Sequence, residues 1–515
     1  MPRWNVRYAG SLRPRKLAMR RKRAAALLVL TAAAPLCAED LLGSARQHDF
    51  ARRNQQAVDG YRAAVQARPD SFEAWEGMIR CLIRDKRAGE AYQAWEEASR
   101  QPGTGAFRKT AEGHVLFRQA EFDRADAAYG EAIRLDSRAA LAYVGLASLH
   151  GLISQNESAA NVANLAYRLI PENPTAILAR AYELEDPTAH VAALEQALAL
   201  FDPNSEETRA LRIHVASDRQ IGHRDARVLD SPYTAAELRL EQIDPRNDTR
   251  YALTVLLNNR KKVRMLLDTG ASGVSLKSSI VKNAGLERLA EEGTEVEGIG
   301  DKKAPLSYSY LAESLAIGPV RFRDYVVSVS DRQGGMDGII GADVFSQFLV
   351  TLDFRARRLL LAPYPGLAVP PDRTKAINGE RRAGTHRVFR RGNHLFLPVA
   401  VNKKASRLFL IDTGAFTNLI SADFAREQTK LSHNGSVRIH GVQGEVDKVF
   451  NASQVELTFA GLRQNNSGML AFDFGKLSNE FGFEIGGIIG MPILEQLRVT
   501  IDYRNGAVEM RYKDK

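Results

Sequence analysis

A short stretch ending in Asp-Thr-Gly-Ala occurs twice in this chain and constrains the fold more than any other feature. The copies are Leu266–Ala271 and Leu410–Ala415, and each follows an apolar, strand-like run. A glycine-bracketed segment follows each copy at nearly the same interval, beginning at Gly298 and at Gly441, and an Ile-Ile-Gly turn follows each at a similar interval. One such tripeptide is expected by chance about once in several thousand residues. Two copies with matched neighbours indicate an internal duplication.

Each copy resembles a retropepsin-like aspartic protease domain, the family of the retroviral proteases and their bacterial relatives. The matching features are the Asp-Thr-Gly-Ala loop, the glycines of the bracketed segment and the Ile-Ile-Gly turns that end at Gly341 and Gly490. The resemblance covers roughly the C-terminal half of the chain. It implies that each domain supplies one catalytic aspartate, so that two domains must meet. They can meet within one chain, or each can pair with its twin in a homodimer.

The resemblance assigns roles to individual residues. Asp268 and Asp412 would be the catalytic carboxylates, sharing one proton because two neighbouring carboxylates do not both ionise readily. The active-site loops would be supported by Thr269, Gly270, Thr413 and Gly414. The flaps that close over an extended peptide would contain Gly298, Ile299, Gly300, Gly441, Val442, Gln443 and Gly444. The chemistry would need no cofactor and no metal.

The two copies also differ. Phe416 follows the second loop where Ser272 follows the first, and the second turn leads into Met491 and Pro492. These differences predict an asymmetric substrate groove. In both copies the loop ends in alanine, at Ala271 and Ala415, and the resemblance implies activity nearer neutral pH than a serine there would. Asp343, just after the first turn, is predicted to start a short helix rather than to act in catalysis.

The N-terminal half has helical periodicity and a repeat of about 34 residues. Small residues, then aromatic residues, then small residues recur at that interval: Ala57, Ala91 and Ala125; Tyr61, Trp95 and Tyr129; Ala64, Ala98 and Ala132. The pattern resembles tetratricopeptide repeats, which stack into a solenoid and usually present a groove to a protein or peptide. The sequence therefore predicts an all-α solenoid followed by two tandem all-β retropepsin-like barrels. The partner of the repeats is not identified.

We predict the following segments: a signal peptide over 1–38, helical repeats over 39–215, a linker or docking segment over 216–245, the first protease-like domain over 246–362, a proline-rich linker over 363–385 and the second domain over 386–515. The first segment has a basic start, an apolar run over 24–34 and small residues at Cys37 and Ala38, which is typical of an export signal. A periplasmic or secreted location follows. Retention as a membrane anchor and lipidation of Cys37 stay open.

The formal charge of +10 does not indicate a nucleic-acid partner. Nine of the basic residues precede the first acidic residue, Glu39, and without them the balance is only +1. Of the two cysteines, Cys37 would leave with the signal and Cys81 is predicted to be a packed thiol. No Cys/His spacing indicates a zinc site.

Two hypotheses follow. The first is an exported aspartic endopeptidase whose repeats recruit or restrain the substrate. The second is a non-catalytic interaction scaffold in which the protease folds only bind peptide. The paired Asp-Thr-Gly loops favour the first, because an inactive relative would be free to lose either aspartate.

Overall fold

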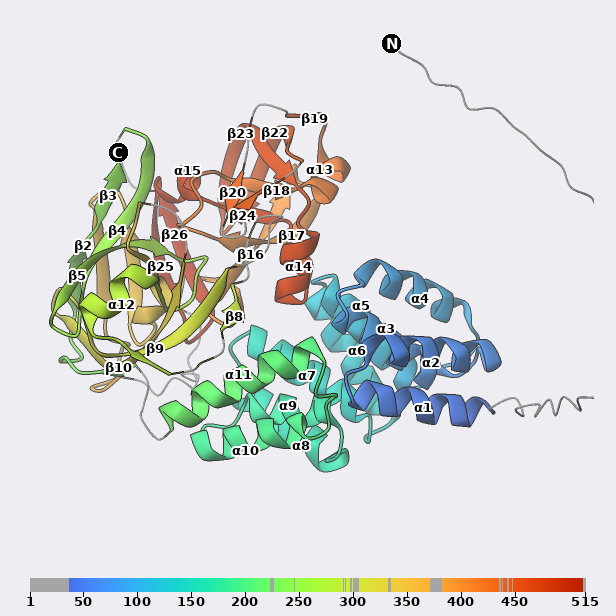
Figure 1. Ribbon diagram of the computed structural model, residues 1–515. Coiled ribbons are helices and arrows are strands. Elements are labelled where there is room, and N and C mark those ends of the chain that lie inside the picture. The colour runs from blue at the N-terminus through green and yellow to red at the C-terminus, as the bar shows by residue number, and fades with distance from the viewer. Residues whose placement is uncertain are drawn as a thin grey trace, which may run out of the picture.

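The computed structural model describes residues 37–512 except for 223–226, 245, 290, 292, 297, 298, 300–304, 332–334, 371–381, 435, 436, 438, 442, 443 and 447. The predicted signal segment lies outside these residues apart from its last two positions. A helical part leads into two β-rich lobes, which stand side by side above it in Figure 1. The predicted fold class, a helical-repeat solenoid followed by two all-β barrels, is confirmed. Among the described residues no helix is long and apolar enough to cross a bilayer.

The solenoid consists of helical hairpins and a final helix. The hairpins are α1 (Ala38–Phe50) with α2 (Asn54–Ala67), α3 (Phe72–Arg84) with α4 (Ala88–Arg100), α5 (Ala106–Arg118) with α6 (Phe122–Leu135), α7 (Ala140–Leu152) with α8 (Asn156–Leu169), and α9 (Pro174–Ala181) with α10 (Pro187–Leu198). The last helix is α11 (Glu206–Ile221). Asn173 and Asp186 cap α9 and α10, and a proline occupies the first turn of each.

The repeated aromatic residues pack where the sequence pattern places them. Tyr129 is buried in α6 and lies between two glycines of neighbouring helices: a Cβ at Gly113 or Gly145 would come within 2.4 or 2.3 Å of its ring. Glycine is required at both places because the helices approach so closely. Cys81 is buried in the core of the first repeats, where burial raises the pKa of its thiol to about 12. This is the packed, unreactive thiol that the sequence predicts.

The first and last repeats of the solenoid contact each other. The backbone N–H of Asp202 donates to the carbonyl of Ala51 at 2.8 Å, and Arg53 pairs with Asp202 at 2.7 Å. Arg52, nearly fully buried, lies 3.2 Å from Glu207 at the start of α11. These contacts join the turn between α1 and α2 to the loop between α10 and α11. The start of α11, the last helix of the solenoid, therefore packs against the turn of the first helical hairpin.

The first lobe contains β1 (Val228–Leu229), β3 (Glu241–Asp244), β4 (Asp248–Leu257), β5 (Lys261–Asp268), β6 (Val274–Lys277), α12 (Ser278–Ala284), β7 (Glu287–Arg288), β8 (Thr294–Glu295), β9 (Leu306–Ile317), β10 (Val320–Ser330), β11 (Gly338–Gly341) and the 3₁₀ helix η1 (Ala342–Phe345). The β4–β5 hairpin turns at Asn258 and Asn259, both at positive φ, as a tight right-twisting hairpin requires. Strand β11 lies parallel to β5 and antiparallel to β6, and β9 pairs with both β10 and β4. These pairings curl the sheet around one core.

The second lobe repeats this topology. It contains β15 (Phe389–Arg391), β16 (His394–Val401), β17 (Ala405–Ile411), β18 (Leu419–Ser421), α13 (Ala422–Gln428), β19 (Leu431–His433), β20 (His440–Gly441), β21 (Gly444–Glu445), β22 (Phe450–Phe459), β23 (Leu462–Phe472), α14 (Gly475–Phe481), β24 (Gly487–Ile489) and α15 (Met491–Leu494). Strand β24 lies parallel to β17 and antiparallel to β18, as β11 does in the first lobe. Helix α14 has no counterpart among the described residues of the first lobe.

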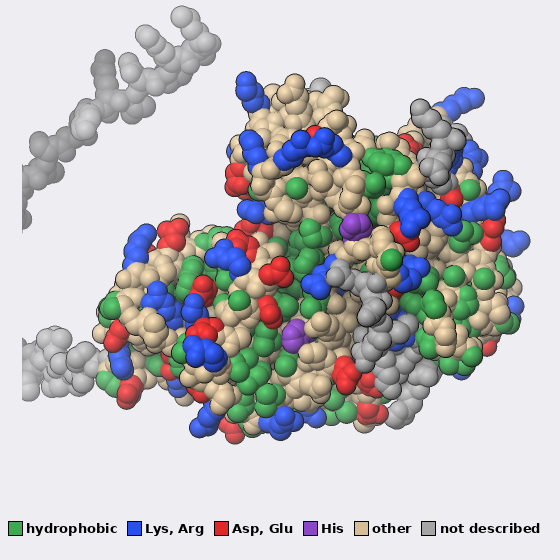
Figure 2. All heavy atoms as spheres, turned by 180° about the vertical axis from the view of Figure 1, so that it is seen from behind, with side chains coloured by type: hydrophobic (Ala, Val, Ile, Leu, Met, Phe, Trp, Pro, Cys, Tyr) green, Lys and Arg blue, Asp and Glu red, His purple; other side chains and the backbone are tan. Residues whose placement is uncertain are grey.

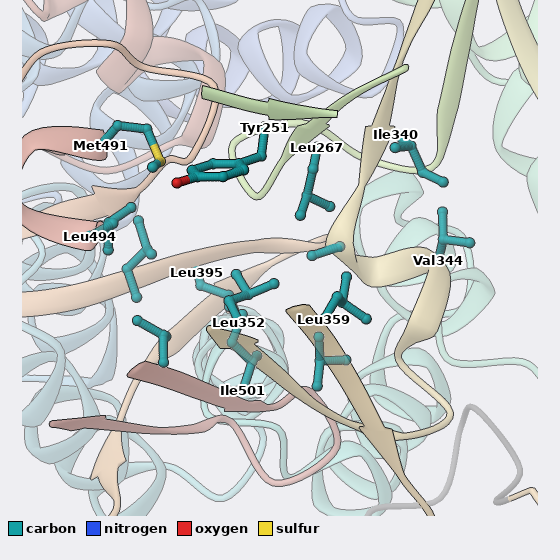
Figure 3. Close-up of a cluster of buried hydrophobic side chains, with 14 of the residues drawn as sticks. Tyr251, Leu267, Ile340, Val344, Leu352, Leu359, Leu395, Met491, Leu494 and Ile501 are labelled. Carbon is teal, nitrogen blue, oxygen red and sulfur yellow. The ribbon is translucent and has the colours of Figure 1, made fainter. Parts of the chain in front are cut away.

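A six-stranded antiparallel sheet joins the lobes. Its central strands are β12 (Leu349–Asp353) and β25 (Leu497–Asp502), one from each lobe, and each pairs with its own hairpin partner, β13 (Arg358–Ala362) or β26 (Ala507–Tyr512). The edges are β2 (Ala236–Arg239) and β14 (His386–Arg387). Figure 3 shows Leu352 and Leu359 from the first lobe beside Ile501 from the second, inside a cluster that continues across both lobes. The two lobes therefore share one core.

One of the two predicted linkers contains secondary structure. Residues 216–245 contain the end of α11 and three strands, of which β2 pairs with β13 and β3 pairs with β4. Alternation of apolar and polar residues is short here, so edge-strand pairing was not visible in the sequence. The alternative of a docking segment fits better. The second segment, 363–385, falls partly outside the described residues, and β14 follows it directly.

The solenoid docks on the second lobe. Phe122 of α6 packs against Phe389 and Phe483, with ring centroids 4.8 and 5.5 Å away, in a buried cluster drawn from both parts. Polar contacts surround it: Arg118 donates to the Asn479 side chain at 2.7 Å, and the Tyr92 hydroxyl to Glu484 at 2.7 Å. An apolar centre surrounded by polar contacts is the composition of a stable interface. The solenoid is thus fixed to one lobe and not merely tethered.

Candidate active site

Two hairpins deliver the two aspartates to the junction of the lobes. Asp268 is the last residue of β5, and Asp412 directly follows β17. The Ile-Ile-Gly runs lie in register beside them, with Gly341 opposite Asp268 and Ile489 opposite Ile411. These runs are central buried strands, which explains their uninterrupted apolar character. Both repeated motifs of the sequence therefore meet at one place in each lobe.

Each carboxyl group lies against the glycine of the opposite loop. A Cβ at Gly270 would come within 2.6 Å of Asp412 Cγ, and a Cβ at Gly414 within 2.3 Å of Asp268 Oδ2. Neither glycine has positive φ. The backbone conformation at these two positions therefore does not itself require glycine. Glycine is needed because any side chain would displace the facing carboxylate.

Backbone N–H groups orient the carboxylates. The N–H of Gly270 donates to Asp268 Oδ1 at 2.8 Å, and the N–H of Gly414 donates to Asp412 Oδ1 at the same distance. A second donor, the N–H of Ala415, reaches Asp412 at 3.0 Å. Each carboxylate thus has one oxygen held by its own loop, which turns the other toward the partner lobe.

The two threonines lock the loops together. Thr269 donates its hydroxyl to the carbonyl of Ile411 at 2.7 Å and accepts from the N–H of Thr413 at 3.0 Å. Thr413 makes the reciprocal pair, to the carbonyl of Leu267 at 2.9 Å and from the N–H of Thr269 at 3.0 Å. All these groups are buried, where an unmade hydrogen bond is costly. The structure thus pairs the two copies within one chain, as one of the two predicted arrangements requires.

The surroundings of the two carboxyl groups raise the pKa of Asp412. Burial raises the pKa of Asp412 well above its usual range, and the charge and hydrogen bond of Asp268 add to the rise. The backbone donors oppose this shift but do not cancel it. The raised pKa favours one retained proton, and the titration belongs to the pair of carboxyl groups.

The predicted flap residues lie only partly within the described residues. Gly298, Gly300, Val442 and Gln443 lie outside them. Ile299 is half-buried and packs against the cluster that joins the second lobe to the solenoid. Gly441 and Gly444 pair as the ends of a two-stranded hairpin, β20 with β21. The segment predicted as the second flap thus contains the β20–β21 pairing, and β8 pairs with β9 just before the segment predicted as the first.

Sequence reasoning missed two residues that stand beside the loops. Arg250 and His394 precede the aspartate of their own copy by the same interval, near the start of β4 and β16. Arg250 donates to the carbonyl of Gly414 at 3.0 Å, and His394 hydrogen-bonds the backbone of Gly270. Each side chain therefore reaches the loop of the opposite lobe. The equal spacing was the available signal, and it becomes visible only when the hairpins of the two copies are aligned.

The pair is asymmetric in charge. The side chain of Asp248 holds Arg250 with a contact of 2.6 Å and raises its pKa, so the guanidinium stays charged. Burial lowers the pKa of His394, so that imidazole tends to be neutral near pH 7. Phe416, 53% exposed, lies under the Arg250 guanidinium at 5.9 Å. The site is therefore asymmetric, as predicted, because the Arg250 cation and the Phe416 ring lie on one side of it.

Asp343 is buried in η1 and does not cap the helix. It accepts a hydrogen bond from the backbone N–H of Gly273 at 2.9 Å and lies 3.8 Å from Arg227. Burial raises its pKa. Its role is to hold the end of the first active-site loop, which the sequence assignment as a helix-start residue did not foresee.

Comparisons with known proteins give one family match and several structural neighbours. One family model, described as aspartyl protease, matches residues 253–344 and again 397–493. A retropepsin-like aspartic protease from Rickettsia conorii is 17% identical, with a TM-score of 0.20, over 25% of this chain and 90% of its own. A tetratricopeptide protein from Thermus thermophilus is 19% identical, with a TM-score of 0.28, over 36% of this chain and 99% of its own. No curated protein matches.

Two tandem regions of the C-terminal half therefore match the aspartyl protease family and share one all-β topology, as the sequence predicts. The N-terminal half consists of tetratricopeptide-like repeats.

Proposed function

We propose that this protein is an exported aspartic endopeptidase that hydrolyses peptide bonds through a water held between Asp268 and Asp412. The observation that carries the proposal is the reciprocal placement of the two carboxyl groups, each against the other loop's glycine. A scaffold that only binds peptide has no need of two facing carboxylates, because burying them together costs stability.

The proposed reaction assigns a different role to each carboxyl group. Asp268, ionised, takes a proton from the water as the water attacks the scissile carbonyl carbon. Asp412, protonated, donates a hydrogen bond to the carbonyl oxygen as negative charge develops there. The proton taken up by Asp268 then passes to the leaving amine. The threonine contacts keep both groups placed during these steps, which is the positional requirement of such a mechanism.

The substrate is proposed to be an extended protein segment. The β20–β21 hairpin and the loop around Ile299 would close over it, and their backbone groups would bond it as an added strand. Arg250 and Phe416 on one side would favour an acidic or aromatic substrate residue there. The repeats, fixed to the second lobe through Phe122, would present or restrain the substrate at a constant position relative to the site.

Export rests on the sequence of the segment 1–38 and stays part of the proposal.

On the face seen in Figure 2, acidic and basic side chains are interspersed over the helical part. That distribution gives no support to a nucleic-acid partner.

The test is cleavage of casein by the purified protein, compared with Asp268→Asn and Asp412→Asn across acid to neutral pH. Asp423→Asn is the matched control, because Asp423 is an exposed aspartate on α13 away from the loops. Loss of cleavage in both active-site variants, with the control unaffected, is expected. Full activity in either variant would contradict the shared dyad. A wild type that binds peptides tightly but cleaves none would favour the scaffold hypothesis.

A further inference from the structure

A cluster of metal-ligating side chains lies in the last two helices of the solenoid, away from the aspartates. His214 and Asp218 are one helical turn apart on α11 and therefore share one face of that helix. His190 reaches them from α10. One ligand atom of each residue lies within 4.8 Å of the other two. No other group of three or more such residues is found among the described residues.

The two separations that involve Asp218 match those around a bound ion. Asp218 Oδ2 is 3.4 Å from His190 Nε2 and 3.3 Å from His214 Nε2. Nitrogen and oxygen ligands about 2.0–2.1 Å from a tetrahedral Zn²⁺ are about 3.3 Å from each other. The same distances are long for direct N–H···O hydrogen bonds. Asp218 Oδ2 is buried and, among the described residues, accepts no hydrogen bond of good geometry.

A second contact fixes the ligating nitrogen. His190 Nδ1 lies 2.7 Å from the backbone carbonyl of Ala181. A carbonyl can only accept, so Nδ1 carries a proton and donates it, and Nε2 is the nitrogen that faces Asp218. A metal-bound histidine usually has its other nitrogen held in this way. Without a metal ion the carboxylate of Asp218 raises the pKa of His190, and an ion bound at Nε2 would replace the proton there. The rings of His190 and His214 are 6.1 Å apart and nearly perpendicular, so both can direct Nε2 to one point without stacking.

We propose that His190, His214 and Asp218 form a site for one divalent transition-metal ion of the Zn²⁺ class, which staples α10 to α11. Two imidazoles and a carboxylate suit Zn²⁺, Co²⁺ or Ni²⁺, whereas Ca²⁺ and Mg²⁺ prefer oxygen ligands alone. The sequence did not indicate this site because the two histidines lie far apart along the chain, on different helices, and no cysteine takes part.

The place of the site gives the ion a structural task. Helices α9 to α11 share a small apolar cluster that includes Leu194 and Val215. The start of α11 contacts the first repeat through Glu207, and its end leads toward the first lobe at β1. An ion that ties α10 to α11 would stabilise the last repeat where the chain passes to the protease domains. The His214 side chain is 49% exposed, so a solvent molecule can complete the coordination.

The test is titration of the metal-free protein with Zn²⁺ and with Co²⁺, in a Cys37→Ser background because Cys37 is an exposed thiol. We expect one ion per chain, a rise in the midpoint of thermal unfolding and the visible absorption of four-coordinate Co²⁺. Asp218→Asn and His214→Ala should each weaken binding by more than about 100-fold. His433→Ala is the matched control, an exposed histidine in the second lobe that should leave binding unchanged.

The outcomes separate the site from adventitious binding. The proposal is overturned if the wild type binds no Zn²⁺ at millimolar concentration. It is equally overturned if both site variants bind as tightly as the wild type, or if Co²⁺ binds only with the pale spectrum of a hexa-aquo ion. Circular dichroism of each metal-free variant establishes that it is folded. If His214→Ala unfolds the last helices of the solenoid, His214→Gln replaces it, because glutamine is closer to histidine in size.

Discussion

The two protease lobes have the same topology but different surroundings. Both deliver an aspartate from a hairpin and hold it beside an Ile-Ile-Gly strand. The first lobe places a charged Arg250 against the opposite loop, and the second places His394 there. Among the described residues, α14 and the aromatic rings that hold Phe122 of the solenoid belong to the second lobe. The comparison shows that duplication preserved what the carboxyl pair requires, while the contacts around it diverged.

The threonine contacts are the most symmetric part of the molecule. Replacing Thr269 or Thr413 by valine keeps the shape but leaves a buried carbonyl and a buried N–H unpaired, at about 1–3 kcal/mol for each group. We expect equal losses of unfolding free energy for the two variants and a fall in kcat of about 100-fold from misplaced carboxylates. Urea unfolding and peptide cleavage measure both.

Thr351→Val is the matched control, since its hydroxyl bonds the Thr500 hydroxyl in the sheet between the lobes and no other group among the described residues. Thr351→Val should lower the free energy of unfolding by about 1 kcal/mol and leave kcat unchanged. Clearly unequal losses for Thr269→Val and Thr413→Val would show that the lobes do not contribute equally.

Solenoid docking is the largest asymmetry between the lobes. Phe122→Ala removes the ring that packs on Phe389 and Phe483, and we expect a loss of about 3–5 kcal/mol in unfolding free energy. Phe107→Ala is the control, because Phe107 on α5 is 45% exposed. This variant should lower the free energy of unfolding by about 0.5 kcal/mol or less. If the two variants unfolded at the same urea concentration, the solenoid would be an independent unit.

The protonation of the carboxyl pair can be tested through stability. The folded-state pKa of Asp412 is raised above its usual value of 3.8, so the folded protein binds more protons than the unfolded chain above that pH. The contribution of Asp412 to stability is therefore fully present below the unfolded pKa and is lost as pH rises toward the folded one. Asp412→Asn removes this slope.

We expect Asp412→Asn to match the wild type near pH 3.8 and to be more stable at neutral pH, although it is inactive. Unfolding free energies measured at several pH values give the slope directly. Asp423→Asn should keep the wild-type slope. A variant less stable than the wild type at neutral pH would mean that the pair is not strained by burial.

The smallest expected effect is on substrate preference. Exchanging Arg250→His and His394→Arg moves the fixed charge from one side of the dyad to the other. An exposed charge contact is worth about 1 kcal/mol, so we expect a change of about fivefold in kcat/KM between peptides with an acidic residue on either side of the scissile bond. Competition between two such peptides measures the ratio. An unchanged ratio would mean that these side chains only support the loops.

Much of this architecture could be predicted from the sequence. The duplicated Asp-Thr-Gly loops predict two lobes and one carboxylate from each, and the regular repeat of the N-terminal half predicts the stacked helical hairpins with Tyr61 and Tyr129 in their core. These features are local or periodic. The residue type at each repeated position can be interpreted directly, because the same local packing recurs at a fixed interval along the chain.

Other features depend on which segments meet. Two identical loops are equally compatible with a homodimer, and only the reciprocal contacts of Thr269 and Thr413 pair them within one chain. The strands within 216–245 include one whose partner lies far along the chain, since β2 pairs with β13. His190 meets His214 and Asp218 only because α10 packs on α11. Contacts of this kind leave no periodic trace in the sequence, since the partners are chosen by three-dimensional packing and not by neighbours along the chain.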